Sequence, residues 1–225
     1  SNVEQDEFLF NMLTPKQTYE DKEEFSDQTI STYEKEYLGF YISNHPVEKL
    51  FYNKQYLGIF TIKNSSDYQP ILVQINQIKQ IRTKNGQHMA FLVLDDGRTT
   101  INGVLFPDKY KQYEVMIQQQ KDILVIHGKF EERNQKRQII IQNIDTIDDF
   151  ESNKLFHAKK IMIRNVDHLD DIKPFLLDQS TNQGLEVILF NEVQQQNKIL
   201  GFLQKETKQV ERFIKMFKPS GIRII

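Results

Sequence analysis

The stretch ILVQINQIKQI, residues 71–81, opens the part of the chain that decides its fold. It is followed by HMAFLVLDD at 88–96, TTINGVLF at 99–106, DILVIHGKF at 122–130 and RQIIIQNIDTI at 137–147. Short β-rich segments in which apolar and polar residues alternate are typical of half-buried strands. A helix is expected from Pro107 to about Gln119, between the third and fourth strands. This order predicts a five-stranded OB barrel, a fold whose strand 2–3 face and loops bind oligonucleotides.

The rest of the chain is expected to form three further parts around a barrel domain at 69–150. Residues 1–36 contain ten acidic residues against three lysines, which predicts a flexible acidic arm at 1–30. Residues 31–68 read as a helical linker segment interrupted at Pro46.

Residues 151–225 are expected to form a small C-terminal α+β domain. The segments KKIMIRNV, GLEVILFNEV, KILGFLQKE and GIRII read as strands, and residues 168–177 and 208–217 as helices. This βαββαβ order predicts a two-layer sandwich. The fold class is therefore mainly β plus α+β, and the tail either binds another protein or completes the body.

Composition excludes several classes of protein. Apolar residues make up 39% of the 225 residues, the net charge is -2 and there is no cysteine, which excludes disulfides and thiolate metal sites. No apolar run reaches the roughly 18 residues of a membrane span. Without a signal-peptide pattern at the start, we expect a soluble cytoplasmic protein that does not bind membranes.

Basic residues gather at the turns of the expected barrel. Arg82 and Lys84 lie at the strand 1–2 loop, Arg98 lies at the strand 2–3 turn, and the strand 4–5 loop is flanked by Lys129, Arg133, Lys136 and Arg137. Cations beside an OB groove would contact phosphates and make binding salt-dependent. Because Glu131 and Glu132 partly neutralise the last loop, we expect weak, sequence-independent binding of single strands.

Three aromatic residues of the barrel have two possible roles. Phe91, Phe106 and Phe130 could each stack a base, or each could fill the barrel core, since every strand has one face turned inward. The alternation of the sequence leaves both roles open.

The sequence contains no constellation for catalysis, cofactor binding or a metal site. The five histidines lack the i, i+4 spacing of a zinc site, and no nucleotide-binding glycine motif is present. Asp95 and Asp96 could suggest magnesium, but the run Asp95-Asp96-Gly97-Arg98 favours a turn. His45 beside Pro46 is interpreted as a capping or packing residue.

The acidic arm contains one apolar island, Gln5-Asp6-Glu7-Phe8-Leu9-Phe10. It has the form of a linear peptide in which Gln5 would bond a pocket rim and Phe8, Leu9 and Phe10 would be buried anchors. The alternative is that these residues begin a helix packed on the body.

Two longer motifs resemble the DnaE type of bacterial DNA polymerase III alpha subunit. They are EKEYLGFYISNHP at 34–46 and TKNGQHMAFLVLDD at 83–96, and Phe106-Pro107 and VIHGK at 125–129 follow in the same order. Asn44 stands where the family usually has glycine. The resemblance spans residues 1 to about 150 well and the tail more weakly.

This resemblance implies a non-catalytic C-terminal part of a replicative DNA polymerase, a nucleotidyltransferase of DNA replication. It implies that Gln5, Phe8 and Phe10 match a sliding-clamp-binding peptide, that the barrel holds single-stranded template, and that the tail contacts the clamp-loader tau subunit. The polymerase active site would lie outside this chain. The alternatives are an RNA- or tRNA-binding OB module, as in a synthetase, and a protein-interaction module that binds no nucleic acid.

Overall fold

The computed structural model describes residues 29–30, 33–38, 45–118, 123–164, 169–177, 184–191, 194–217 and 221–225. The chain divides into two units, residues 1–43 and residues 44–225, and each is described by itself. In the first unit the described residues include a π-helical turn, η1 (Glu34–Leu38). The predicted peptide at residues 5–10 lies outside the described residues.

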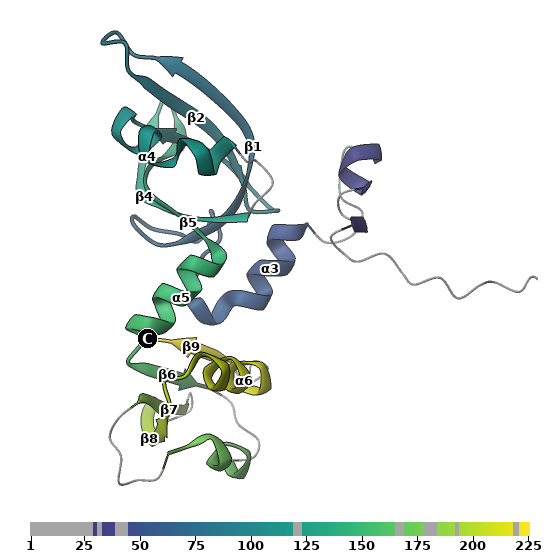
Figure 1. Ribbon diagram of the computed structural model, residues 1–225, viewed down its shortest axis with the longest axis vertical. Helices are drawn as coiled ribbons and strands as arrows, with labels where there is room; N and C mark the ends of the chain where they lie inside the picture. The colour runs from purple at the N-terminus through teal and green to yellow at the C-terminus, as the bar shows by residue number, and fades with distance from the viewer. Residues whose placement is uncertain are drawn as a thin grey trace, which may run out of the picture. The chain divides into compact units, whose positions relative to one another are not determined.

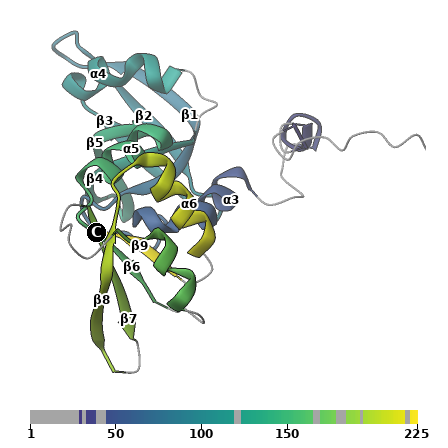
Figure 2. The same cartoon turned by 60° about the horizontal axis from the view of Figure 1, so that its bottom comes forward.

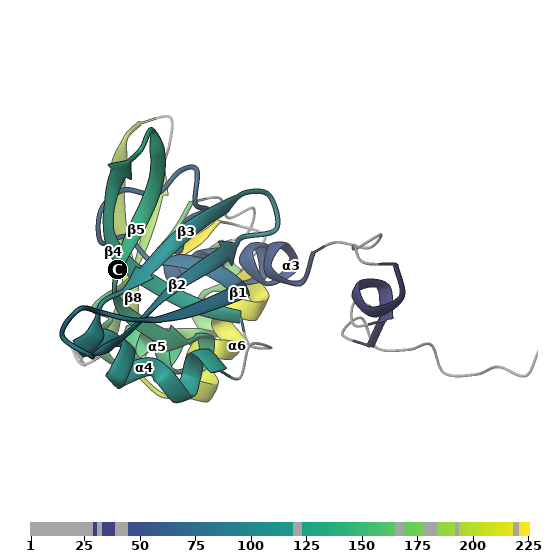
Figure 3. The ribbon, with the colours of Figure 1, turned by 90° about the horizontal axis from the view of Figure 1, so that it is seen from above.

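The second unit contains the predicted barrel. Its elements are β1 (Ile71–Arg82), β2 (His88–Asp95), β3 (Thr100–Leu105), α4 (Pro107–Gln118), β4 (Ile123–Arg133) and β5 (Lys136–Thr146). The strands close into a barrel in the order β1-β2-β3-β5-β4, which confirms the OB fold (Figures 1 and 3). Neighbouring strands are antiparallel except β3 and β5, which are parallel.

The barrel interior is filled by every second residue of its strands. Ala90, Leu92 and Leu94 of β2 face Ile139 and Ile141 of β5 in one apolar cluster. The helix α4 adds to this cluster through the buried side chains of Tyr110, Tyr113 and Ile117. Burial of this alternating apolar set holds the strand register in place, because a one-residue slip would turn the whole set outward.

Two helices join the barrel to the tail. They are α3 (Pro46–Lys54), which continues into the 3-10 turn η2 (Gln55–Leu57), and α5 (Ile147–His157). They lie side by side between the barrel and the tail sheet (Figures 1 and 2), and Lys54 and Tyr56 both bond the carboxylate of Glu151.

The helix α5 was missing from the sequence prediction, which carried the last barrel strand to Ile147. None of its side chains is fully buried, so it has no apolar periodicity to reveal it. The signal that identifies it is a cap: the Thr146 hydroxyl accepts a hydrogen bond from the Asp149 amide, 3.1 Å away.

The tail is a four-stranded sheet in the order β8-β7-β6-β9. Its elements are β6 (Lys160–Ile163), the 3-10 turns η3 (Leu169–Asp171) and η4 (Lys173–Phe175), β7 (Leu185–Asn191), β8 (Gln196–Leu203), α6 (Thr207–Phe217) and β9 (Ile222–Ile224). The α+β prediction is confirmed. The predicted helix at 168–177 is wrong, since two 3-10 turns lie there. Pro174 has no N–H to donate to the carbonyl four residues earlier, which interrupts a continuous α-helix.

The tail and the outside of the barrel share one apolar core. Phe213 and Phe217 of α6 pack on the tail sheet, and the same cluster includes Leu72 of β1, Val125 of β4 and Leu57 of η2. The barrel interior forms a second cluster. Among the described residues, no helix combines the length and the apolar character needed to span a membrane.

Candidate nucleic-acid interface

The outer face of β2 and β3 carries the side chains that do not enter the barrel. Because successive side chains of a strand point to opposite faces, the burial of Ala90, Leu92 and Leu94 turns Phe91 and Val93 outward. Phe91 belongs to neither apolar cluster and is half-buried. The structure therefore resolves the ambiguity at Phe91 in favour of the outer face.

One row of residues runs around the outside of the closed barrel and takes one residue from each of its five strands. Strand register pairs Lys79 of β1 with Phe91, Phe91 with Val104, Val104 with Ile140 of β5, and Ile140 with Lys129 of β4. Both lysines are exposed, and the three residues between them are apolar: Phe91 and Ile140 are half-buried and Val104 is buried. The row thus has an aromatic and aliphatic centre with a cation at each end.

A second row runs beside the first and is polar. Register pairs Gln77 with Val93, Val93 with Asn102, Asn102 with Gln138, and Gln138 with Glu131. The Gln138 amide donates a hydrogen bond to the Glu131 carboxylate. This bond engages the one carboxylate in the row. Asn102, at the middle of the row, is exposed.

The other two aromatic residues have different environments. Phe106, directly after β3, is half exposed at 50%. Phe130 packs against the barrel core, and the Arg137 guanidinium lies 3.8 Å from its ring centre. Phe106 is therefore available to a ligand, whereas Phe130 takes part in packing.

Two of the predicted cationic side chains, those of Arg98 and Arg137, form hydrogen bonds with other residues of the chain. Arg137 donates hydrogen bonds to the carbonyl oxygens of Ile62, at 3.0 Å, and Ser65, at 2.8 Å. Arg98 reaches α3, where its Nε and Nη2 atoms lie 2.8 and 2.6 Å from Glu48 Oε1. The hydrogen bonds that Arg98 donates to Glu48, and then to Tyr52, raise the pKa of its guanidinium. Much of the hydrogen-bonding capacity of both residues is used internally.

The remaining predicted cations divide between the two faces of the strands. The side chain of Arg82 points to the face of β1 opposite Lys79 and Ile81. There its Nε lies 2.8 Å from His88 Nε2. Exposed positions at the loops and strand ends belong to Lys84, Lys129, Arg133 and Lys136. Of the predicted set, Phe91 and Lys129 share the first row.

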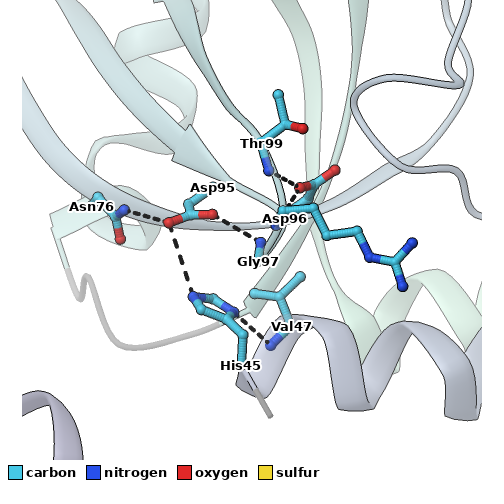
Figure 4. A network of polar contacts seen from close by, with 8 residues as sticks. His45, Val47, Asn76, Asp95, Asp96, Gly97 and Thr99 are labelled. Atoms are coloured by element: carbon cyan, nitrogen blue, oxygen red, sulfur yellow. Dashed lines mark hydrogen bonds and ion pairs between the residues drawn. The ribbon is translucent and has the colours of Figure 1, made fainter. Parts of the chain in front are cut away.

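The turn between β2 and β3 is held by its own carboxylates, as Figure 4 shows. Asp95 accepts a hydrogen bond from the Gly97 amide at 2.8 Å, and His45 Nε2 lies 3.9 Å from its Oδ2. His45 Nδ1 in turn accepts from the Val47 amide at the start of α3. The turn and capping interpretations of these residues are confirmed. Among the described residues no cluster of three or more metal-ligating side chains occurs.

Sequence reasoning missed Lys79. The alternation of inward and outward side chains along β1 is broken by a bulge between Ile75 and Gln77. Counting every second residue from the buried start of β1 therefore assigns Lys79 to the wrong face. Pairing with Phe91 across the strands identifies its face, and this pairing exists only in the folded barrel.

Comparison with known proteins agrees with the fold and identifies relatives. Residues 73–147 match the family of OB-fold nucleic acid binding domains. The whole chain is 50% identical to DNA polymerase III subunit alpha of Staphylococcus epidermidis and 49% identical to that of Staphylococcus aureus, in each case over 21% of the relative's length. The chain therefore spans about a fifth of these relatives.

Solved structures resemble the chain only in part. A domain of replication protein A from Methanococcus maripaludis is 18% identical with a TM-score of 0.33, over 40% of this chain and 94% of that domain. RecG bound to a three-way DNA junction is 16% identical with a TM-score of 0.32, over 64% of this chain and 21% of that chain.

Proposed function

Because the whole chain is homologous to a segment of the bacterial DNA polymerase III subunit alpha, we propose that it is a part of a replicative DNA polymerase that holds single-stranded template. The OB-fold match over residues 73–147 supports a nucleic-acid ligand. Within this part of the polymerase, the barrel binds the strand and no nucleotidyl transfer takes place.

The observation that carries the proposal is the row from Lys79 through Phe91 to Lys129. Aromatic rings stack on any base, and cations at the sides of the groove contact phosphates. Phe91 and Ile140 are the accessible apolar residues of the row, and with a cation at each end they suit an unpaired strand on the outside of the barrel. The row offers few groups to read a particular base, so binding is independent of sequence.

Fluorescence anisotropy with labelled oligo-dT tests the proposal. Phe91→Ala should weaken binding by about 1–3 kcal/mol, the contribution of one stacked base. Phe156→Ala is the matched control, because Phe156 is 73% exposed and lies on α5 rather than on the barrel face. Equal affinity of the Phe91 variant and the wild type would contradict the assigned face.

The salt dependence separates phosphate contact from other modes of binding. Replacing Lys79 and Lys129 together by Gln should reduce the slope of log K against log salt by about 1.4, because each contact to a single-strand phosphate contributes about 0.7. Binding that does not change with salt, or no binding at all, would refute a template-holding role.

The same assay distinguishes the two alternative functions. A clear preference for oligo-rU over oligo-dT would favour an RNA- or tRNA-binding module, and the absence of binding to both would favour a protein-interaction module. The chain mixed with primed template and deoxynucleotides should show no primer extension, since its sequence contains no constellation of residues for catalysis.

We also propose that the peptide at residues 5–10 binds the sliding clamp of the polymerase. The support is its sequence, in which Gln5 precedes the apolar anchors Phe8, Leu9 and Phe10. Replacing Gln5 and Phe10 by Ala should abolish capture of the clamp in a pull-down, while Gln17→Ala, elsewhere in the acidic arm, should leave it unchanged. Undiminished capture by the double variant would remove this assignment.

The tail domain is proposed to contact the clamp-loader tau subunit. The support is the resemblance to the polymerase family. Co-purification of tau with the chain, and its loss when residues 158–225 are deleted, tests the proposal, provided that the shortened chain still binds oligo-dT. Retention of tau by the shortened chain would contradict it.

A further inference from the structure

An open pocket of about 480 Å³ lies where the turns at one end of the barrel meet. Its walls come from the start of β3, the start of β5 and the segment just before the barrel. The lining residues are Ile62, Lys63, Thr99, Thr100, Ile101, Asn102, Lys136 and Arg137. This volume falls within the range of small-molecule sites.

The chemistry of the lining favours an anion. Three lining side chains are cationic, and none is acidic. Among the described residues, neither Lys63 nor Lys136 has an ion-pair partner, and Lys136 and Lys63 are both exposed. Two threonine hydroxyls and the Asn102 amide add hydrogen-bonding groups. Two ammonium groups beside these hydroxyls form an environment in which a phosphate is stabilised.

One wall of the pocket is apolar. Ile62 and Ile101 line it and are themselves almost fully buried, at 2% and 6% exposure. An apolar wall beside cations matches a nucleotide, which has a flat apolar base at one end and a phosphate at the other.

The segment that carries Lys63 is pinned by buried polar groups. The Asp96 carboxylate is 5% exposed, and its Oδ2 accepts a hydrogen bond from the Ile62 amide at 2.7 Å. The carbonyl oxygen of Ile62 accepts from Ser65 and from Arg137, each at 3.0 Å. Burying a carboxylate is unfavourable unless hydrogen bonds compensate it, and here they hold the pocket wall in place before any ligand binds.

The pocket is continuous with the proposed strand-binding face. Asn102 belongs both to the pocket lining and to the second row, between Val93 and Gln138. From Val104 in the first row to Thr100 in the pocket the path follows β3 for roughly 14 Å, at about 3.4 Å per residue. A strand that stacks on Phe91 can therefore pass over Asn102 into the pocket.

We infer that this pocket holds one nucleotide of the bound single strand, with its phosphate between Lys63 and Lys136 and its base against Ile62 and Ile101. The inference rests on the proposed function and extends it, because it assigns a terminal subsite and adds Lys63, a residue outside the barrel strands, to the interface. Arg137 acts as a positioning residue that fixes the wall carrying Lys63.

A titration followed by amide NMR tests the chemistry of the pocket with small probes. Thymidine 5′-monophosphate should shift the amide signals of Thr99, Thr100 and Asn102, and thymidine without phosphate should shift them several-fold less. The Lys63→Gln, Lys136→Gln double variant should lose the response. Equal shifts from both probes, or shifts confined to other residues, would overturn the inference.

Oligo-dT binding by the same full-length variant separates this inference from the proposed function. The pocket variant should lower the salt slope by about 0.7, because a single phosphate lies between the two lysines. The charge-matched control, Lys198→Gln with Lys208→Gln on exposed tail positions, should match the wild type. If the wild type binds and the pocket variant binds with an unchanged slope, the pocket inference fails while the template-holding role stands. If the wild type does not bind, the template-holding role itself fails.

Discussion

Single buried residues determine how the barrel surface is presented. Asp96 is the clearest case: its Oδ1 accepts from the amides of Arg98, at 3.0 Å, and Thr99, at 2.7 Å, while its Oδ2 accepts from Ile62. One carboxylate therefore shapes the β2–β3 turn and fixes the neighbouring segment, although it touches no proposed ligand. Its three donors are backbone amides, which explains how a carboxylate is tolerated at 5% exposure.

His127 is the residue through which we expect pH to affect the stability of the protein. It lies on β4, with its Nε2 3.8 Å from Asp145 and its ring 5.6 Å from that of Phe150. Burial lowers the pKa of His127 and outweighs the opposing effects of a backbone hydrogen bond with Tyr68 and the charge of Asp145. The unfolded chain, with a histidine pKa of about 6.5, then binds more protons than the folded one.

We therefore expect His127 to destabilise the folded state as the pH falls from about 6.5 through the lower folded pKa. Thermal unfolding measured between pH 7.5 and pH 5 should show a shallower decline in the midpoint for His127→Gln than for the wild type. His157→Gln, at an exposed position on α5, is the control. If all three proteins decline with the same slope, the lowered pKa of His127 is wrong.

At the scale of elements, the β4–β5 pair depends on a bulge between His127 and Gly128. A Cβ atom at Gly128 would lie 2.3 Å from the carbonyl oxygen of Ile140 and 2.8 Å from the Ile139 side chain. Because β5 pairs with β3 as well as β4, a shift of β5 would disturb both pairings. The glycine is required by the close approach of two backbones.

Gly128→Ala should therefore lower the free energy of unfolding by about 3 kcal/mol, as expected for overpacking against a backbone that cannot move away. Gly86→Ala provides the comparison. Gly86 has a φ of 77° but open space around it, so only backbone strain of about 1 kcal/mol is expected. Urea unfolding measures both variants, and equal costs at the two positions would contradict the close approach at Gly128.

At the scale of the whole molecule, the barrel and the tail are parts of one folded body. Leu72 and Val125 of the barrel belong to the same apolar cluster as Phe213 of the tail helix, and Leu57 joins them from η2. All four are almost completely buried. Removal of the tail would expose Leu57, Leu72 and Val125, each of which contributes roughly 1.5–3 kcal/mol through burial.

A chain shortened to residues 1–157 should therefore melt well below the full chain and bind a hydrophobic dye. Leu72→Ala in the full chain is the milder test, since it should lower one common transition by about 2–5 kcal/mol in unfolding free energy. NMR signals of Leu94 in the barrel and Phe213 in the tail should disappear at the same temperature. Separate transitions, or an unchanged melting temperature after truncation, would show two independent domains.

Local patterns in the sequence were sufficient for the type and order of most elements. The alternation in HMAFLVLDD and RQIIIQNIDTI identifies strands because one face of each must be buried in a barrel. The same reasoning found α4 and α6. It missed α5, because none of its side chains is fully buried and its main sequence signal is the N-cap. It also joined η3 and η4 into one helix across Pro174.

The amino-acid sequence by itself determined the OB barrel, the α+β tail and the family resemblance, because period-2 burial and turn residues act over neighbouring positions. Only the tertiary structure decided which residues share a surface. Lys79, Phe91 and Lys129 form one row through strand pairing, and Lys63 lines the same pocket as Lys136 while Asp96 holds the amide of the neighbouring Ile62. These residues are far apart along the chain, and no local pattern can encode a register that a bulge and barrel closure set together.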